Sequence, residues 1–138
     1  MITKILVAFD GSESAERAFH WALEVAKPFH AGITILAVAR PSEPPTAVET
    51  EALLESAQEH FEKDFKRMLA DAQTNGIKIE TTVVVGHPAE QVVHYATEKR
   101  IDLIVMGHRG RSVLERWLLG SVSKRVLSYA PCTVTIVR

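Results

Sequence analysis

The stretch ILVAFDGS, residues 5–12, decides the fold. Its first five residues are all apolar, and Asp10-Gly11-Ser12 then ends the run. Continuous apolar runs that stop at turn residues are typical of strands buried on both faces of a parallel sheet. Further segments with this character are residues 33–39, 77–85, 102–106 and 132–137. We therefore expect a parallel sheet of five strands.

Helical patterns separate these strands. After Ser12, apolar residues recur at spacings of three and four from Ala15 to Phe29, which predicts a helix capped by Ser12 or Ser14. Further helices are expected at 49–75, from Pro88 onward, and at 121–129. Strands that alternate with helices predict an open α/β sheet with helices on both faces. No internal repeat is visible, so residues 1–138 are expected to form one domain.

The net charge, the cysteine count and the lengths of the apolar runs indicate which partners and which cellular compartment to expect. Lys and Arg total 16 and Asp and Glu total 17, so a net charge of -1 offers no general attraction to nucleic acid or an anionic membrane. Cys132 is the only cysteine, which fits a reducing compartment. The start of the chain is too short to be a signal peptide, and no apolar run reaches the roughly 18 residues of a membrane span. We expect a soluble, cytoplasmic protein.

Candidate ligand-binding residues follow the first and fourth expected strands. Open α/β sheets bind ligands beyond the carboxyl ends of their strands, where the strand order reverses. Asp10-Gly11-Ser12 follows the first strand, and Gly107-His108-Arg109-Gly110 follows the fourth. If these strands are neighbours, both segments face one crevice.

The second segment belongs to a longer pattern, Gly107-x2-Gly110-x9-Gly120, with Ser121, Val122 and Ser123 directly after it. Glycine lets backbone N–H groups approach phosphate oxygens and permits positive φ. The helix start at Gly120 favours an anion, because its N–H groups are free and its dipole is positive there. The serine hydroxyls, Arg109 and Arg111 are further donors. The pattern predicts a phosphate site, although its spacing also suits a loop whose glycines only make turns.

Three segments together resemble the universal stress protein family. VAFDGS at 7–12 is similar to its first-strand signature, IVMGHRG at 104–110 with GSVS at 120–123 to its ATP-binding motif, and PCTVTIV at 131–137 to its closing strand. The resemblance covers essentially the whole chain, and the intact motif implies the ATP-binding branch. It implies a Rossmann-like sheet of the adenine nucleotide alpha hydrolase-like type, in the order 3-2-1-4-5, with strands one and four adjacent at the reversal.

The resemblance also implies ATP in that crevice, with ADP or AMP as alternatives and Mg²⁺ as a candidate companion of the phosphates. By analogy, the adenine and ribose end would be lined by Ala8, Asp10 and Val38. The ribose and α-phosphate would be wrapped by Met106, Gly107, Arg109 and Gly110. The outer phosphates would be held by Gly120, Ser121, Val122 and Ser123.

Simpler roles remain open for several of these residues. Asp10 also suits a carboxylate at a helix N-terminus with no ligand. His108 lies inside the motif, so its side chain is a candidate ligand contact, whereas Lys124 and Arg125 suit a solvated helix face. The histidines show no His-x-x-x-His or Cys–His spacing, so we expect no metal site formed by the protein.

Function is narrowed to three hypotheses. The sequence holds no Gly-x-x-x-x-Gly-Lys-Ser/Thr loop and no nucleophile and base at a familiar spacing. The first hypothesis is therefore a nucleotide-dependent stress-response module or switch, with slow hydrolysis at most. The alternatives are a slow ATPase or phosphotransferase that uses a divalent ion, and a dimeric scaffold without nucleotide.

A homodimer through the last strand, residues 132–137, is also expected. Val134 and Ile136 alternate there with threonines, and an apolar edge strand invites pairing. The family resemblance places the dimer contact on the same strand.

Overall fold

The computed structural model describes residues 1–41, 46–109 and 120–138. The elements are β1 (Lys4–Ala8), α1 (Glu13–Phe29), β2 (Gly32–Ala39), α2 (Ala47–Thr74), β3 (Ile79–Val85), α3 (Pro88–Glu98), β4 (Leu103–Gly107), α4 (Ser121–Tyr129) and β5 (Thr133–Val137). The expected elements are thus all present, with ends that differ by one or two residues.

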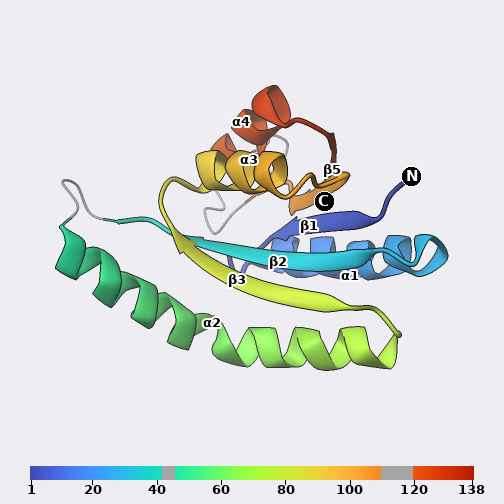
Figure 1. The fold of residues 1–138 in the computed structure, drawn as a ribbon, viewed down its shortest axis with the longest axis horizontal. Coiled ribbons are helices and arrows are strands. Elements are labelled where there is room, and N and C mark those ends of the chain that lie inside the picture. Colours follow the sequence, from blue (N-terminus) through green and yellow to red (C-terminus); the bar gives the residue numbers. More distant parts are fainter. Residues whose placement is uncertain (42–45, 110–119) are drawn as a thin grey trace.

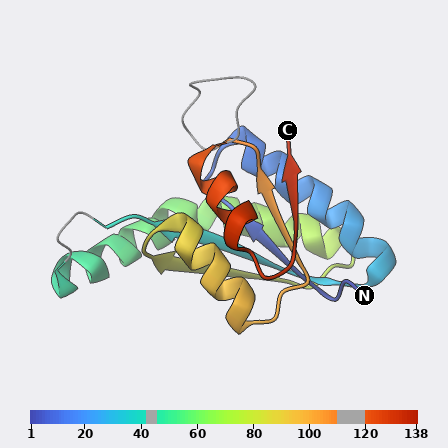
Figure 2. The ribbon, with the colours of Figure 1, turned by 90° about the horizontal axis from the view of Figure 1, so that it is seen from above.

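The five strands form one parallel sheet in the order β3-β2-β1-β4-β5, which confirms the expected topology (Figure 1). Helices α1 and α2 pack on one face, and α3 and α4 pack on the other. Figure 2 shows β5 at one edge of the sheet, beside α1. The strand order reverses between β1 and β4, where Val7 is paired with Val105.

The central strand is buried on both faces. Ile5, Leu6 and Val7 are completely inaccessible to solvent, which explains why the run has no polar alternation. On the α1 and α2 side, the ring of Phe9 packs against Phe61 and Phe65, with centroids 6.0 and 6.4 Å away. Apolar side chains therefore pack against β1 on both faces of the sheet.

Local capping explains where two helices begin. Ser12, not Ser14, caps α1, because its hydroxyl accepts from the backbone N–H of Ala15. Helix α2 begins two residues before the expected Glu49, since Thr46 and Glu49 form a reciprocal capping box. Glu49 is therefore the third residue of this helix and not its first.

The start of β3 is delayed for a related reason. The backbone N–H of Ile77 donates to Ala72 and closes the end of α2, and Gly76 adopts a left-handed φ of 68°. Because the N–H of Ile77 is bonded to the end of α2, the strand begins at Ile79 and not at the expected Ile77.

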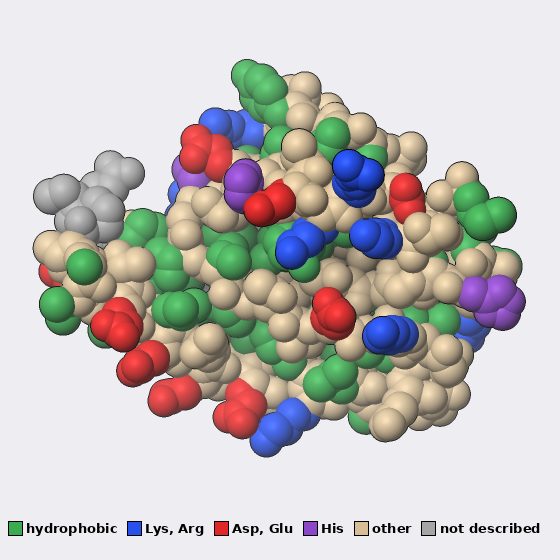
Figure 3. Space-filling view, viewed as in Figure 1, with side chains coloured by type: hydrophobic (Ala, Val, Ile, Leu, Met, Phe, Trp, Pro, Cys, Tyr) green, Lys and Arg blue, Asp and Glu red, His purple; other side chains and the backbone are tan. Residues whose placement is uncertain are grey.

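The surface mixes both signs of charge. Figure 3 shows acidic side chains along α2, with lysines and arginines spread between other side chains on the same face. This distribution agrees with the nearly balanced composition. Within the three described ranges, none of the helices combines the length and apolar character that crossing a bilayer requires.

Candidate functional site

The sheet order brings the predicted site residues to one end of the molecule. Because β1, β2 and β4 are parallel neighbours, the residues at their carboxyl ends lie together. This places at one end Ala8, Asp10, Val38, Met106, Gly107 and Arg109. A backbone hydrogen bond from Gly120 to His108 adds the start of α4, with Ser121, Val122 and Ser123. Gly110 lies outside the described residues.

Asp10 organises the turn between β1 and α1. Its Oδ1 accepts from the backbone N–H of Ser12 at 2.9 Å, and Ser12 in turn caps the helix. Gly11 between them has a φ of 84°, a conformation that favours glycine. The half-buried carboxylate is thus held at the amino end of α1, an arrangement that suits both roles considered for it.

Gly107 is required for a reason that the glycine pattern does not reveal. A Cβ at this position would lie 2.1 Å from Oγ of Ser14 and 2.8 Å from its carbonyl carbon. No real side chain tolerates such distances, so Gly107 allows α1 to cross close to the end of β4. The φ of Gly107 is not positive, so glycine is needed here for its missing side chain and not for an unusual backbone conformation.

The two ends of the glycine pattern are joined through the backbone of His108. Its N–H donates to the Val137 carbonyl at 2.9 Å, and its carbonyl accepts from the N–H of Gly120 at 2.8 Å. The backbone of His108 is therefore hydrogen-bonded both to the end of β5 and to the residue that precedes α4. This junction sets the start of α4 relative to the carboxyl end of the sheet.

The serines of the motif have different surroundings. Ser121 is exposed, whereas Ser123 is 3% exposed and its hydroxyl donates to the Gly107 carbonyl at 2.9 Å. We expected both hydroxyls to donate to phosphate. In this structure the Ser123 hydroxyl instead donates within the protein, and this hydrogen bond links α4 to the end of β4.

The start of α4 has the features of an anion site. Gly120 is its N-cap and supplies no side-chain hydrogen bond, and the first turn carries no acidic residue. Its N–H groups and the positive end of its dipole therefore favour an anion. Arg125 is exposed, as expected for a solvated helix face, and its guanidinium also lies 3.2 Å from Nε2 of His87 and 3.6 Å from Oε1 of Glu90. It links α4 to α3.

His108 occupies a place that its sequence position did not indicate. The side chain is 7% exposed, and Nδ1 lies 3.4 Å from Oγ of Ser14 on α1. Burial lowers the pKa of this imidazole, and the cations Arg109, Arg138 and Arg17 lower it further. Sequence reasoning did not single out Ser14 for this pairing, and its place next to the helix cap is only a weak signal.

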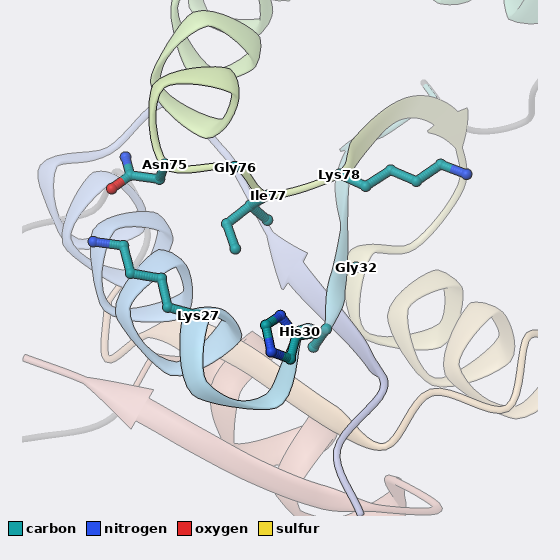
Figure 4. A pocket seen from close by; sticks show the side chains of 8 residues that line it. Lys27, His30, Gly32, Asn75, Gly76, Ile77 and Lys78 are labelled. Atoms are coloured by element: carbon teal, nitrogen blue, oxygen red, sulfur yellow. The ribbon is translucent and has the colours of Figure 1, made fainter.

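A surface hollow of about 400 Å³ lies at the opposite end of the sheet, where α1 and α2 end (Figure 4). Its lining includes Lys27, His30, Asn75 and Lys78. The side chain of Lys78 extends away from the other labelled residues, so these polar groups do not converge on one point. This hollow is separate from the predicted site.

Comparisons with known proteins agree with the fold. Residues 1–138 match the model of the universal stress protein family. A universal stress protein of Methanocaldococcus jannaschii is 38% identical over 142 residues, which cover 98% of this chain and 81% of that protein. The solved structure of universal stress protein UspA from Lactobacillus plantarum has a TM-score of 0.88 at 30% identity, covering 99% of this chain and 97% of that one.

A second solved structure carries a nucleotide. It is a universal stress protein in complex with cAMP, with a TM-score of 0.76 and 28% identity, and the match covers 99% of this chain and 97% of that chain. The family match extends over residues 1–138, and solved structures of the family share the fold. The chain belongs to the universal stress protein family.

Proposed function

We propose that this chain binds an adenine nucleotide, with ATP as the first candidate, and acts as a nucleotide-dependent stress-response module or switch. The observation that carries the proposal is the hydrogen bond between Gly120 and His108, which brings the start of α4 to the carboxyl ends of β1 and β4. An anion-favouring helix start and the carboxylate of Asp10 then share one end of the sheet. The cAMP complex of a related protein supports an adenine nucleotide as the ligand.

The roles proposed for individual residues are those that the family resemblance implies. In this proposal Ala8, Asp10 and Val38 line the adenine and ribose end. The ribose and first phosphate contact Met106, Gly107, Arg109 and Gly110. The outer phosphates lie against Gly120, Ser121 and Val122, while Ser123 supports them through its bond to the Gly107 carbonyl. Any Mg²⁺ would accompany the phosphates and take oxygen ligands from them.

Binding is favoured over rapid hydrolysis. A P-loop lysine is missing from the sequence. Oδ1 of Asp10 accepts from Ser12, and the His108 ring is buried against Ser14. Neither group is arranged as an obvious general base. We expect turnover well below about 1 per second, the lower end of ordinary enzyme rates.

We also propose a cytoplasmic homodimer that pairs through β5. This strand is an open edge of the sheet, with half-buried Val134 and Ile136. Tyr129, at the end of α4 shortly before β5, is 70% exposed, and Leu127 is 44% exposed. An edge strand next to exposed apolar side chains suits a second copy of the chain.

Calorimetric titration of the purified protein with ATP, ADP, AMP and cAMP tests nucleotide binding. Mass spectrometry of the denatured protein would show whether a nucleotide co-purifies. Binding of adenine nucleotides at micromolar to millimolar concentration, with little phosphate release, is the expected result. No binding and no ligand-induced rise in melting temperature at millimolar nucleotide would instead favour a scaffold with an empty site.

A further inference from the structure

Three buried polar side chains meet around one dipeptide. Within the described parts of the chain, the buried polar or charged residues are Ser14, His108 and Ser123, which are 5%, 7% and 3% exposed. The dipeptide is Gly107-His108. Ser14 lies against Gly107 and near the His108 ring, and Ser123 donates to the Gly107 carbonyl. Burying polar groups costs free energy unless they are hydrogen-bonded. Their concentration at this one point of an apolar core therefore indicates that they have a role there.

The contacts around His108 form a continuous chain. The Ser14 hydroxyl donates to the Val137 carbonyl at 3.4 Å, and its oxygen also lies 3.4 Å from Nδ1 of His108, from which it accepts when the neutral ring carries its proton on Nδ1. The same Val137 carbonyl accepts from the His108 backbone at 2.9 Å. The imidazole therefore connects α1 and the end of β5 to the residue whose carbonyl accepts from Gly120.

Positive groups surround this imidazole. Arg17 approaches from α1, where Glu13 lies 3.9 Å from it, and its Nε donates to the carbonyl of Arg138. Arg138 follows β5, and Arg109 is next in the chain. Burial and these three cations lower the pKa of His108, so the ring is neutral at neutral pH. Protonation would place a further positive charge among them.

We propose that His108 is a positioning residue for the nucleotide site: its neutral imidazole, held by Ser14, fixes the His108 backbone, whose carbonyl accepts from Gly120 at the start of α4. The inference rests on the proposed nucleotide binding. His108 acts through its own carbonyl and Gly120 and does not touch the ligand. Protonation of the ring drives it from its pocket beside the arginines and releases the start of α4, which lowers the affinity for phosphate.

The test is the dissociation constant for AMP, measured from about pH 8 to about pH 4.5, a range that extends well below the ordinary histidine pKa because the pKa of His108 is lowered. At the upper pH, His108→Asn and Ser14→Ala each weaken binding by about tenfold, the effect expected from one buried hydrogen bond. On acidification the wild type loses additional affinity, so its advantage over His108→Asn shrinks. Titration of the AMP phosphate affects both proteins equally and cancels in this ratio.

Two surface substitutions serve as controls. His94→Asn removes an exposed histidine of α3, and Ser128→Ala removes a hydroxyl that bonds only to its own helix turn at Lys124. Both should bind AMP as the wild type does at every pH. An unchanged affinity in His108→Asn, or a ratio to wild type that stays constant or widens on acidification, would overturn the inference.

Should His108→Asn not fold, Ser14→Ala and the wild type decide the question. The ring protons of His108, followed by NMR, must titrate in the same pH interval in which the wild type loses affinity. Loss of affinity without titration of this ring, or wild-type affinity in Ser14→Ala, contradicts the inference. Absence of AMP binding to the wild type at about pH 8 would instead refute the proposed function itself.

Discussion

A Cβ atom at residue 107 would lie 2.1 Å from Oγ of Ser14, so the end of β4 and the first turn of α1 touch through a glycine. This contact predicts that Gly107→Ala destabilises the whole domain. Overpacking of this kind costs about 1–3 kcal/mol in the free energy of unfolding. Urea denaturation followed by circular dichroism measures it.

Gly32→Ala is the matched control for this substitution. Its Cβ would meet the Lys78 carbonyl at an ordinary 3.8 Å, and it lies at the opposite end of the sheet. Equal stability of the two variants would show that α1 shifts freely away from β4.

Gly120→Val should remove nucleotide binding while the protein stays folded. Gly120 has a φ of -63°, which valine adopts readily, so the change adds a side chain at the helix start without backbone strain. We expect affinity to fall by roughly a hundredfold or more, as several charge-assisted hydrogen bonds are blocked. Calorimetry with ATP checks this, with Gly32→Ala as the control. Wild-type affinity in a folded Gly120→Val variant would place the phosphates elsewhere.

Asp102 ties the N-terminal segment to the start of β4, and its loss should weaken the fold. Its Oδ2 accepts from the backbone N–H and the hydroxyl of Thr3, each at 2.9 Å, and from the N–H of Lys4 at 3.0 Å. The Thr3 backbone bond is the largest cause that lowers the pKa of this carboxyl, followed by the Lys4 bond and the Thr3 hydroxyl. Asp102→Asn should cost about 1 kcal/mol at neutral pH, a modest value because the bonds face solvent.

The pH dependence of this loss has a definite sign. A lowered pKa means that the folded protein binds the proton less readily than the unfolded chain. The stabilisation is therefore complete above the unfolded pKa of about 4 and disappears as the pH falls through the folded value. The stability difference between wild type and Asp102→Asn, measured by urea denaturation, should shrink as the pH falls below about 4, while Asp71→Asn on α2 serves as a control. A difference that persists unchanged in acid would contradict this assignment.

Tyr129→Lys should weaken the proposed dimer. Tyr129 is 70% exposed at the end of α4, two residues before Pro131 and four before the start of β5, so a lysine there leaves the monomer core intact. Light scattering should give a dimer mass for the wild type at micromolar concentration and a lower mass for the variant. Val48→Lys, which changes an apolar residue of α2 that is 78% exposed, should remain dimeric. A monomer mass for the wild type would exclude pairing through β5.

Much of the fold could be predicted from the sequence. The apolar run before Asp10 became the central strand, Pro88 begins α3, and α4 covers the expected residues 121–129. These features depend on signals within a few residues: side-chain periodicity, the fixed φ of proline and the free N–H groups of a helix start. The order of the strands came from the family resemblance, because local periodicity does not specify which strands are neighbours.

The sequence by itself determined the elements and marked the glycine pattern as a candidate phosphate site. Only the tertiary structure decided why Gly107 must be glycine, that Ser123 bonds to the Gly107 carbonyl, and that His108 pairs with Ser14. Ser14 and His108 are 94 residues apart. Their contact exists because β1 and β4 are adjacent and α1 crosses the end of β4, and such a long-range arrangement leaves no trace in the periodicity of either segment.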